Sequence, residues 1–160
     1  MRIAIITVCY LPEINGAVYH IEALRKGLIE LGHDVLIVKP DANTKHHHIT
    51  DGILYSPAVK LHNLYNYSVS YPHSRIRLRL LKEWKPDIIH IHHEFSQGLF
   101  ALYAGRKLNI PIVYTCHSMY YDYIHYFGAL QNFQAVKDFI DHGILRYTNA
   151  AKAVICASTK

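Results

Sequence analysis

The sequence predicts an α/β protein built on an open parallel sheet with helices on both faces. Short apolar runs rich in β-branched residues alternate with longer segments in which apolar residues recur every three or four positions. The apolar runs lack polar alternation, which is typical of strands that helices cover on both faces. Ligands bind such sheets outside the carboxyl ends of the strands, so polar residues that follow a strand are candidates for a site.

The first unit is a strand, a turn and a helix. Residues 2–8 (RIAIITV) form the expected strand, and the Asn15-Gly16 pair provides the turn. Helical spacing then runs to Leu31, with Asn15 as the expected N-cap and Gly32 as the stop. A helix that begins after such a turn has free backbone N–H groups, which attract phosphate. Asn15 and Gly16 are therefore candidate phosphate-binding residues, and the alternative is that the pair only makes the corner.

The remaining strands and helices alternate along the chain. Strands are expected over 34–38, 53–56, 87–92, 110–115 and 153–157, and helices over 74–84, 96–108 and 131–149. The stretches 40–52 and 61–72 have no clear period and are expected to be a loop and an exposed connection. In the strand over 87–92, the period of two places two isoleucines on one face and two histidines on the other.

The expected helix over 74–84 is strongly basic. Arg75, Arg79 and Lys82 share one face, and Arg77 lies nearby in the sequence. A basic helix face can meet acidic lipid headgroups, which makes these four side chains candidates for a membrane-contacting surface. The alternative is an ordinary helix that covers the sheet and has a solvated basic face.

Three polar clusters follow expected strands. They are the Asn15-Gly16 turn, residues 92–94 and residues 117–121. Because the carboxyl ends of parallel strands meet at one edge of the sheet, we expect these clusters to converge there.

The composition is that of one globular domain. The 160 residues are 51% hydrophobic and 18% charged, which excludes a disordered chain. No apolar run reaches the roughly eighteen residues of a membrane span, and no separate signal segment precedes the first strand, so we expect a cytoplasmic protein. The three cysteines have no CxxC spacing and are expected to be reduced thiols.

The net charge and the three consecutive histidines indicate which ligands and partners the chain could bind. Seventeen basic residues against twelve acidic ones give a net charge of +5, which indicates an anionic partner: nucleic acid, a phosphosugar or an acidic lipid surface. The consecutive histidines 46–48 lie in a loop without a Cys or carboxylate pattern, so we expect no metal site there.

Three segments together resemble a known family. Residues 7–40 (TVCYLPEINGAVYHIEALRKGLIELGHDVLIVKP), residues 85–95 (KPDIIHIHHEF) and residues 115–127 (TCHSMYYDYIHYF) are similar to the acceptor-side half of retaining glycosyltransferases of family four. These enzymes have the GT-B fold, in which two Rossmann-like domains face each other across a cleft. The resemblance extends to the final VICASTK and is greatest to diacylglycerol glucosyltransferases.

The resemblance implies roles for particular residues. Gly16, with Asn15 beside it, would approach the diphosphate of the donor, and His117 would act at the transfer centre by hydrogen bonding to the donor sugar. The resemblance implies acceptor or donor contacts for Glu13, His93 and Glu94, and acceptor contacts for Tyr120, Tyr121 and Asp122. Aromatic rings in that last segment also suit a membrane interface.

The same resemblance implies the reaction and the partners. A hexose would pass from a nucleotide-sugar to a lipid such as diacylglycerol with retention of configuration, without a metal or other cofactor and without nucleic acid. Contact with an anionic membrane would be peripheral, on its inner, cytoplasmic face. The family's donor-binding C-terminal domain is expected to be absent from residues 1–160 and to come in cis or as a separate subunit, so the chain alone is expected to be inactive.

One departure from the family's pattern bears on this interpretation, and two alternatives stay open. Val8 stands where the family usually has Asp, so one polar contact is missing. The first alternative is a non-catalytic binding module, a truncated or partner-dependent domain that holds a membrane surface or another subunit. The second is a plain nucleotide-binding domain, which the missing glycine fingerprint and the missing ribose-binding acid disfavour.

Overall fold

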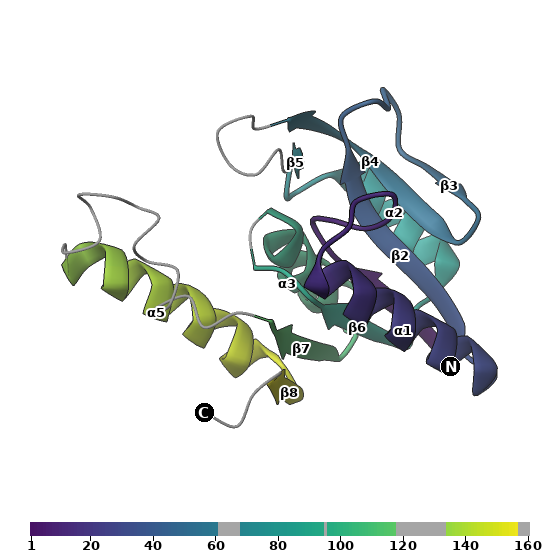
Figure 1. The fold of residues 1–160 in the computed structure, drawn as a ribbon. Coiled ribbons are helices and arrows are strands. Elements are labelled where there is room, and N and C mark those ends of the chain that lie inside the picture. The colour runs from purple at the N-terminus through teal and green to yellow at the C-terminus, as the bar shows by residue number, and fades with distance from the viewer. Residues whose placement is uncertain (61–67, 95, 118–133, 157–160) are drawn as a thin grey trace.

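The computed structural model describes residues 1–60, 68–94, 96–117 and 134–156. Its strands are β1 (Arg2–Ile6), β2 (Asp34–Asp41), β3 (His48–Thr50), β4 (Ile53–Lys60), β5 (Ser68–Ser70), β6 (Ile88–Ile91), β7 (Ile112–Cys116) and β8 (Ala153–Cys156). Its helices are α1 (Gly16–Glu30), α2 (Arg75–Trp84), α3 (Ser96–Leu108) and α5 (Gln134–Ala150). The described strands form one sheet with helices on both sides (Figure 1), so the expected α/β fold is confirmed.

The strand order places β1 in the middle of the sheet. The order is β3-β4-β2-β1-β6-β7-β8, and β1 pairs in parallel with β2 on one side and β6 on the other. The chain therefore moves outward from β1 to β4, returns to β6 and continues to β8. The order reverses between β1 and β6, and open α/β sheets generally bind ligands at the carboxyl ends of the strands on either side of such a reversal.

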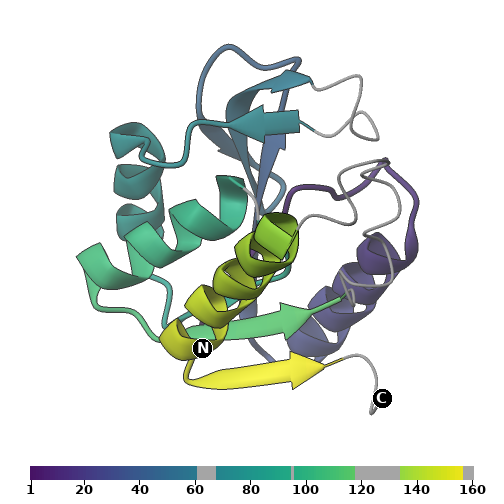
Figure 2. The same cartoon turned by 90° about the vertical axis from the view of Figure 1, so that its left-hand side faces the viewer.

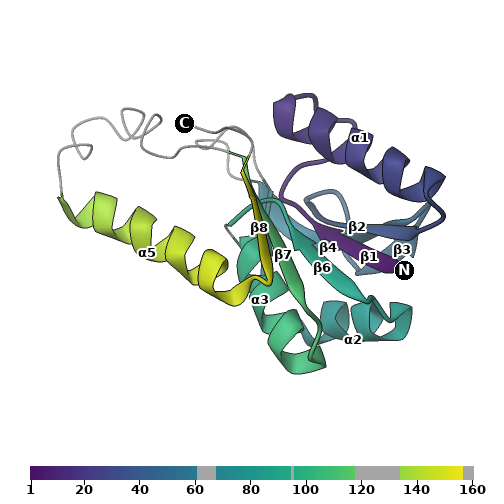
Figure 3. The same cartoon turned by 90° about the horizontal axis from the view of Figure 1, so that it is seen from below.

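Alternate residues of β1 pack on opposite faces of the sheet. Ile3 and Ile5 belong to a buried cluster with Ile21 of α1, whereas Ala4 and Ile6 belong to the larger cluster on the other face. In the two turned views, α1 lies on one side of the sheet, and α2, α3 and α5 lie on the other (Figures 2 and 3). The unbroken apolar runs of the sequence thus reflect burial on both faces.

Both predicted ends of the first helix are confirmed. The Asn15 side chain accepts a hydrogen bond from the Val18 backbone N–H at 2.9 Å, which satisfies one of the free donors of the first turn. At the other end, the Leu31 N–H donates to the Gly27 carbonyl, and Gly32 has φ +81°, the left-handed conformation that favours glycine.

The sheet departs from the prediction at its β4 edge. The expected loop over 40–52 contains β3, the expected third strand continues to Lys60, and the expected connection over 61–72 contains β5. Both short strands run antiparallel to β4, so the sheet is mixed there. Neither has a hydrophobic pattern that indicates a strand from sequence, and each pairs with β4 through its backbone.

Shorter differences occur at element ends. The first strand ends at Ile6 rather than at Val8. The Thr7 hydroxyl donates to the carbonyl of Cys9, two residues further along, at 2.8 Å, and this local hydrogen bond turns the chain. The helix expected over 131–149 is observed as α5, and residues 131–133 lie outside the described part. Ala157, expected to end the last strand, also lies outside it.

We expect a Gly98→Ala substitution to destabilise the fold. A Cβ at this position of α3 would stand 2.6 Å from the His93 carbonyl oxygen and 2.8 Å from Cε1 of Tyr147, and the backbone neighbour cannot move aside easily. The free energy of unfolding should fall by about 1–3 kcal/mol, measured by urea denaturation. Gly27→Ala in α1 is the matched control. A Cβ there meets nothing within 4 Å, so this variant should be unchanged or about 0.5–1 kcal/mol more stable. Equal effects of the two substitutions would contradict the tight packing of α3.

Candidate functional site

A cluster of histidines occupies the sheet edge at the reversal point. His90 and His92 come from the end of β6, His93 follows them, His117 follows β7, and His20 reaches the cluster from α1. The rings of His90 and His92 are 4.1 Å apart between centroids, and those of His92 and His117 are 5.0 Å apart. His20 lies 5.1 Å from the His117 ring, edge to face. The expected convergence of strand-end side chains is therefore found for the β6 and β7 ends.

Hydrogen bonds fix three of these rings. Nδ1 of His92 lies 2.8 Å from Nε2 of His117, and Nε2 of His90 lies 2.8 Å from the Thr115 hydroxyl. Both contacts join β6 to β7, and they lie on the sheet face that α1 covers, opposite the buried Ile89 and Ile91. The predicted alternation of isoleucines and histidines along this strand is confirmed.

The tautomer of His93 follows from its neighbours. The Thr7 hydroxyl donates its one proton to the Cys9 carbonyl at 2.8 Å, so at its 3.0 Å contact with Nδ1 of His93 the hydroxyl must accept. His93 therefore carries its proton on Nδ1, and its bare Nε2 faces the Cys9 sulfur at 3.8 Å. Both ring nitrogens of His93 thus contact atoms of the segment that follows β1.

Cys9 has no reactive environment. Its side chain is buried, and this burial, the main cause, raises the pKa of the thiol. A thiol that is harder to deprotonate is a poor nucleophile, so Cys9 serves packing in this network. The cysteines in the described part of the chain are free, as the sequence predicts.

The four histidines that follow or end β6 and β7 are electrically neutral at pH 7. Burial, with smaller repulsion from neighbouring histidines, lowers the pKa of His90 to about 4 and that of His93 to about 3. Burial and the nearby His20 likewise lower the pKa of His117 to about 4, and burial lowers the pKa of His92 well below its usual value. A neutral imidazole has one donor and one acceptor nitrogen, so these four rings can hydrogen-bond hydroxyl groups but do not attract anions by charge.

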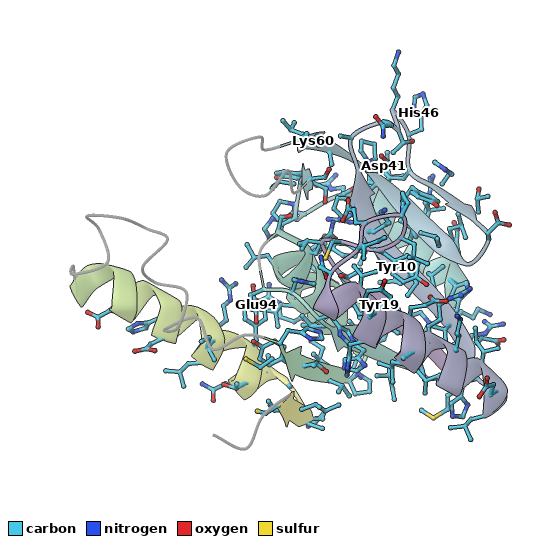
Figure 4. All side chains as sticks on the ribbon, viewed as in Figure 1. Tyr10, Tyr19, Asp41, His46, Lys60 and Glu94 are labelled. Atoms are coloured by element: carbon cyan, nitrogen blue, oxygen red, sulfur yellow. The ribbon has the colours of Figure 1, made fainter. Side chains whose placement is uncertain are left out.

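Glu94, which follows His93, forms hydrogen bonds with residues of β7 and α5. Its carboxylate accepts a hydrogen bond from the Tyr114 hydroxyl, and its backbone carbonyl accepts one from the Tyr147 hydroxyl of α5. Burial and the adjacent Glu94 carboxylate raise the pKa of both tyrosines, so both remain protonated donors. Glu94, labelled in Figure 4, thereby ties the end of β6 to β7 and α5.

The Asn15-Gly16 turn lies at the same edge. Both polar atoms of the Asn15 side chain are engaged, since Oδ1 caps Val18 and Nδ2 donates to the Cys9 sulfur at 3.5 Å. Gly16 is exposed, and a Cβ built on it meets nothing within 4 Å. The backbone at Gly16 is therefore open to a ligand, whereas the Asn15 side chain has a capping role.

A pocket of about 310 Å³ opens beside the turn, at the ends of β2 and β4. It is lined by Leu11, Pro12, Glu13, Lys39, Pro40, Asp41, Ala42, Asn43, Tyr55, Lys60 and Ser68. Lys39 is buried, with its ammonium donating to the Tyr10 and Leu11 carbonyls at 3.4 and 3.2 Å. Asp41 and Lys60, labelled in Figure 4, contribute opposite charges to the wall. Of the predicted acceptor residues, this pocket contains Glu13.

The prediction that Arg77 belongs to a membrane-contacting surface is wrong. Its guanidinium is fully buried, donates to Ser70 at 2.7 Å, to Gln97 at 2.9 Å and to the Tyr71 carbonyl at 2.6 Å, and stacks 3.7 Å above the Phe100 ring centre. Burial lowers the pKa of Arg77 to about 9, so it stays charged at pH 7. A side chain with no exposed surface cannot meet a headgroup.

The other three basic residues of α2 are exposed. Arg75, Arg79 and Lys82 lie on the outer side of the helix, where Arg79 also pairs with Glu83 at 3.8 Å. Leu81 is buried against the sheet, so α2 does cover a sheet face, as the alternative interpretation expected. A solvated basic face and a membrane-contacting face remain compatible with this geometry.

Some predicted residues lie outside the described part of the chain, and some site residues were missed. Tyr120, Tyr121 and Asp122 are among the undescribed residues. His20 and Lys39 were not predicted. The four-residue spacing from His20 to the sheet-facing Leu24 could have indicated His20, and Lys39 at the end of an apolar strand could have indicated a pocket cation. Among the described residues, no group of three or more His, Cys, Asp or Glu side chains is arranged to hold a metal ion.

Comparisons with known proteins agree with the resemblance seen in the sequence. The profile of Glycosyltransferase Family 4 matches residues 14–160. An alpha-monoglucosyldiacylglycerol synthase of Acholeplasma laidlawii is 34% identical over 132 residues, which are 81% of this chain and 33% of that protein. A protein of the same name from Streptococcus pneumoniae is 32% identical over 126 residues, which are 79% of this chain and 29% of that protein. The chain thus spans about a third of the length of these relatives.

A solved structure shares the fold. An alpha-glucosyltransferase in complex with UDP and a 13-mer DNA containing a HMU base superposes with a TM-score of 0.53 at 14% identity, over 98% of this chain and 37% of that chain. At this identity the similarity concerns the fold alone. In the described part of the chain, no helix is long and apolar enough to cross a membrane.

We expect the stability of the chain to fall as the pH decreases from 7 to 5. Unfolded histidines bind protons below about pH 6.5, whereas the folded His90 ring does so only near pH 4, so the unfolded state binds more protons in between. The loss at pH 5 should be about 1–2 kcal/mol for His90 alone, measured by urea denaturation at pH 7, 6 and 5. His46→Gln, which alters an exposed ring, is the control and should leave the slope unchanged. A stability that is constant over this range would contradict a neutral, buried His90.

Proposed function

The chain belongs to glycosyltransferase family 4, and we propose that it is the acceptor-side domain of an enzyme that transfers a hexose from a nucleotide-sugar to a lipid such as diacylglycerol with retention of configuration. The observation that carries this proposal is the group of neutral histidines at the ends of β6 and β7, which includes the half-buried His117. The similarity to two alpha-monoglucosyldiacylglycerol synthases supports a lipid acceptor.

His117 would contact the donor sugar. Its Nε2 is paired with His92, so Nδ1 is the ring nitrogen that would meet a sugar hydroxyl. Gly16 would let the backbone approach the donor diphosphate, since its surroundings are open. Both groups lie at the carboxyl edge of the sheet, where a donor held by a facing domain would come close to them.

The acceptor would lie between this edge and the pocket beside it. Glu13 lines the pocket and is the strongest of the proposed acceptor contacts. His93 and Glu94 make hydrogen bonds within the protein, which favours a role in shaping the crevice. Tyr120, Tyr121 and Asp122 stay proposed acceptor residues on the basis of sequence.

The proposed chemistry needs a second wall. Charge that develops as the sugar leaves its diphosphate is stabilised by preorganised groups on both sides of the cleft, and this chain provides one side. We therefore propose that a donor-binding domain, in cis or as a separate subunit, completes the site. The sugar nucleotide is then a substrate, and no metal or other cofactor takes part.

Transfer of radiolabelled sugar to diacylglycerol in mixed micelles tests the proposal. The chain alone should show negligible turnover with uridine-diphosphate sugars, whereas the chain joined to a donor-side domain of the family should be active. In the joined protein, His117→Ala should reduce transfer by about 10²–10³-fold, because a donor to the transition state is lost. His46→Ala, in an exposed loop, is the matched control.

The melting temperature is measured on the same preparations. Removal of His117 leaves Nδ1 of His92 unpaired, so a loss of about 1–3 kcal/mol in stability is expected while the protein remains folded. An activity loss no larger than the unfolded fraction would assign His117 a structural role only. Turnover by the isolated chain would contradict the proposed need for a second domain, whereas inactivity of the joined protein with every sugar tested would favour a non-catalytic binding module.

Peripheral contact with an anionic membrane is also proposed, through Arg75, Arg79 and Lys82. Replacing all three with Gln should weaken co-sedimentation with vesicles that contain acidic lipid, and binding of the unmodified chain should weaken as salt rises. Replacing the exposed Lys45, Arg106 and Lys107 with Gln removes the same charge elsewhere and is the control. If both triple variants bind equally, or if neutral vesicles bind as well as acidic ones, α2 has no specific membrane role.

A further inference from the structure

The hydrogen bond between His92 and His117 has a direction, and that direction decides what His117 can offer a ligand. The two nitrogens, Nδ1 of His92 and Nε2 of His117, lie 2.8 Å apart, which requires one proton between them. Burial and neighbouring histidines keep both rings neutral at pH 7, so each ring carries one proton. Only two arrangements satisfy these conditions.

In the first arrangement, His92 holds its proton on Nδ1 and donates it. Nε2 of His117 then accepts, and the proton of His117 must lie on its outer nitrogen, Nδ1. In the second arrangement, His117 donates from Nε2, which leaves its Nδ1 bare and forces the proton of His92 onto Nε2.

The surroundings of His92 distinguish the two. His92 is 1% exposed, and its Nε2 is buried with no hydrogen-bond partner among the described residues. The second arrangement would place an N–H group there without an acceptor, whereas the first places only a bare acceptor nitrogen. Buried N–H groups without an acceptor are rarer in proteins than buried acceptors without a donor. The tautomer of the neighbouring His93 is also fixed by a partner, since the Thr7 hydroxyl accepts a hydrogen bond from Nδ1 of His93.

We propose that His92 is a positioning residue that sets the tautomer of His117, so that His117 presents an Nδ1–H donor to the ligand. The role of this N–H in ligand binding rests on the proposed function, whereas the tautomer itself is inferred from the geometry of the His92–His117 pair. A donor N–H at this position recognises an oxygen acceptor, such as a sugar hydroxyl or a phosphate oxygen, and does not recognise an ammonium group. His92 would thus select the class of group that His117 binds without touching the ligand itself.

Histidine tautomers can be read directly by NMR of the ¹⁵N-labelled chain at pH 7, without any ligand. We expect long-range ¹H–¹⁵N correlations to show a protonated Nδ1 and a bare Nε2 for both His92 and His117. A His117 ring protonated on Nε2, or a doubly protonated ring at pH 7, would overturn the proposal. This measurement does not depend on transferase activity, so a failure of the proposed function and a failure of this inference are distinguishable.

Variants of His92 test the dependence of one ring on the other. His92→Asn places an amide N–H near the position of Nδ1, so His117 should keep its Nδ1–H tautomer. His92→Phe removes the donor, and a large part of the His117 population should move to the Nε2–H tautomer. His46→Phe, in an exposed loop, is the control and should leave the His117 signals unchanged. An unchanged His117 tautomer in His92→Phe would overturn the proposal; if that variant does not fold, the spectrum of the unmodified chain still decides it.

Discussion

The pairing of β1 with β2 on one side and β6 on the other is the constraint on which the rest of the molecule depends. Because the chain builds the sheet outward from β1 and then returns to build the other half, the order of strands reverses next to β1. A connection leaving β1 and one leaving β6 then turn to opposite faces, and the space between them cannot be closed by either. The polar residues that follow these two strands are therefore held at an opening, on a rigid buried support.

Burial without charge governs the chemistry at this opening. The strand-end histidines are packed closely enough that a positive charge on one would be poorly solvated and would repel the next. They remain neutral and pair with each other or with the hydroxyls of Thr7 and Thr115. A neutral network of this kind fixes ring orientation before a ligand arrives, which is the condition for preorganised hydrogen bonding.

Arg77 shows the same principle with the opposite outcome. A buried guanidinium is costly to desolvate, and it is tolerated here because three oxygen acceptors and the face of Phe100 surround it. These contacts tie α2 to β5 and to α3. By holding the inner side of α2, Arg77 also fixes which basic residues face outward.

The sequence by itself determined the α/β class, the order of strands and helices along the chain, the capping of α1 and the convergence of the polar side chains that follow β6 and β7. These features depend on local patterns, namely apolar runs, helical spacing and turn residues, which act over a few neighbouring positions. The family resemblance, carried by three longer motifs, was likewise readable from residues alone and agrees with the profile that matches residues 14–160.

Only the tertiary structure decided what depends on contacts between distant segments. The short strands β3 and β5 exist because β4 offers them backbone partners, and their own residues carry no strand pattern. The sequence predicted Arg77 near the basic face of its helix. In the structure the Arg77 side chain is buried, because Ser70 of β5 and Gln97 of α3 accept hydrogen bonds from its guanidinium. His20 contacts the rings of His92 and His117. Lys39 lines the pocket and donates to the Tyr10 and Leu11 carbonyls. The tautomers of His93 and His117 likewise depend on partners 25 residues or more away in the chain, which no local pattern can specify.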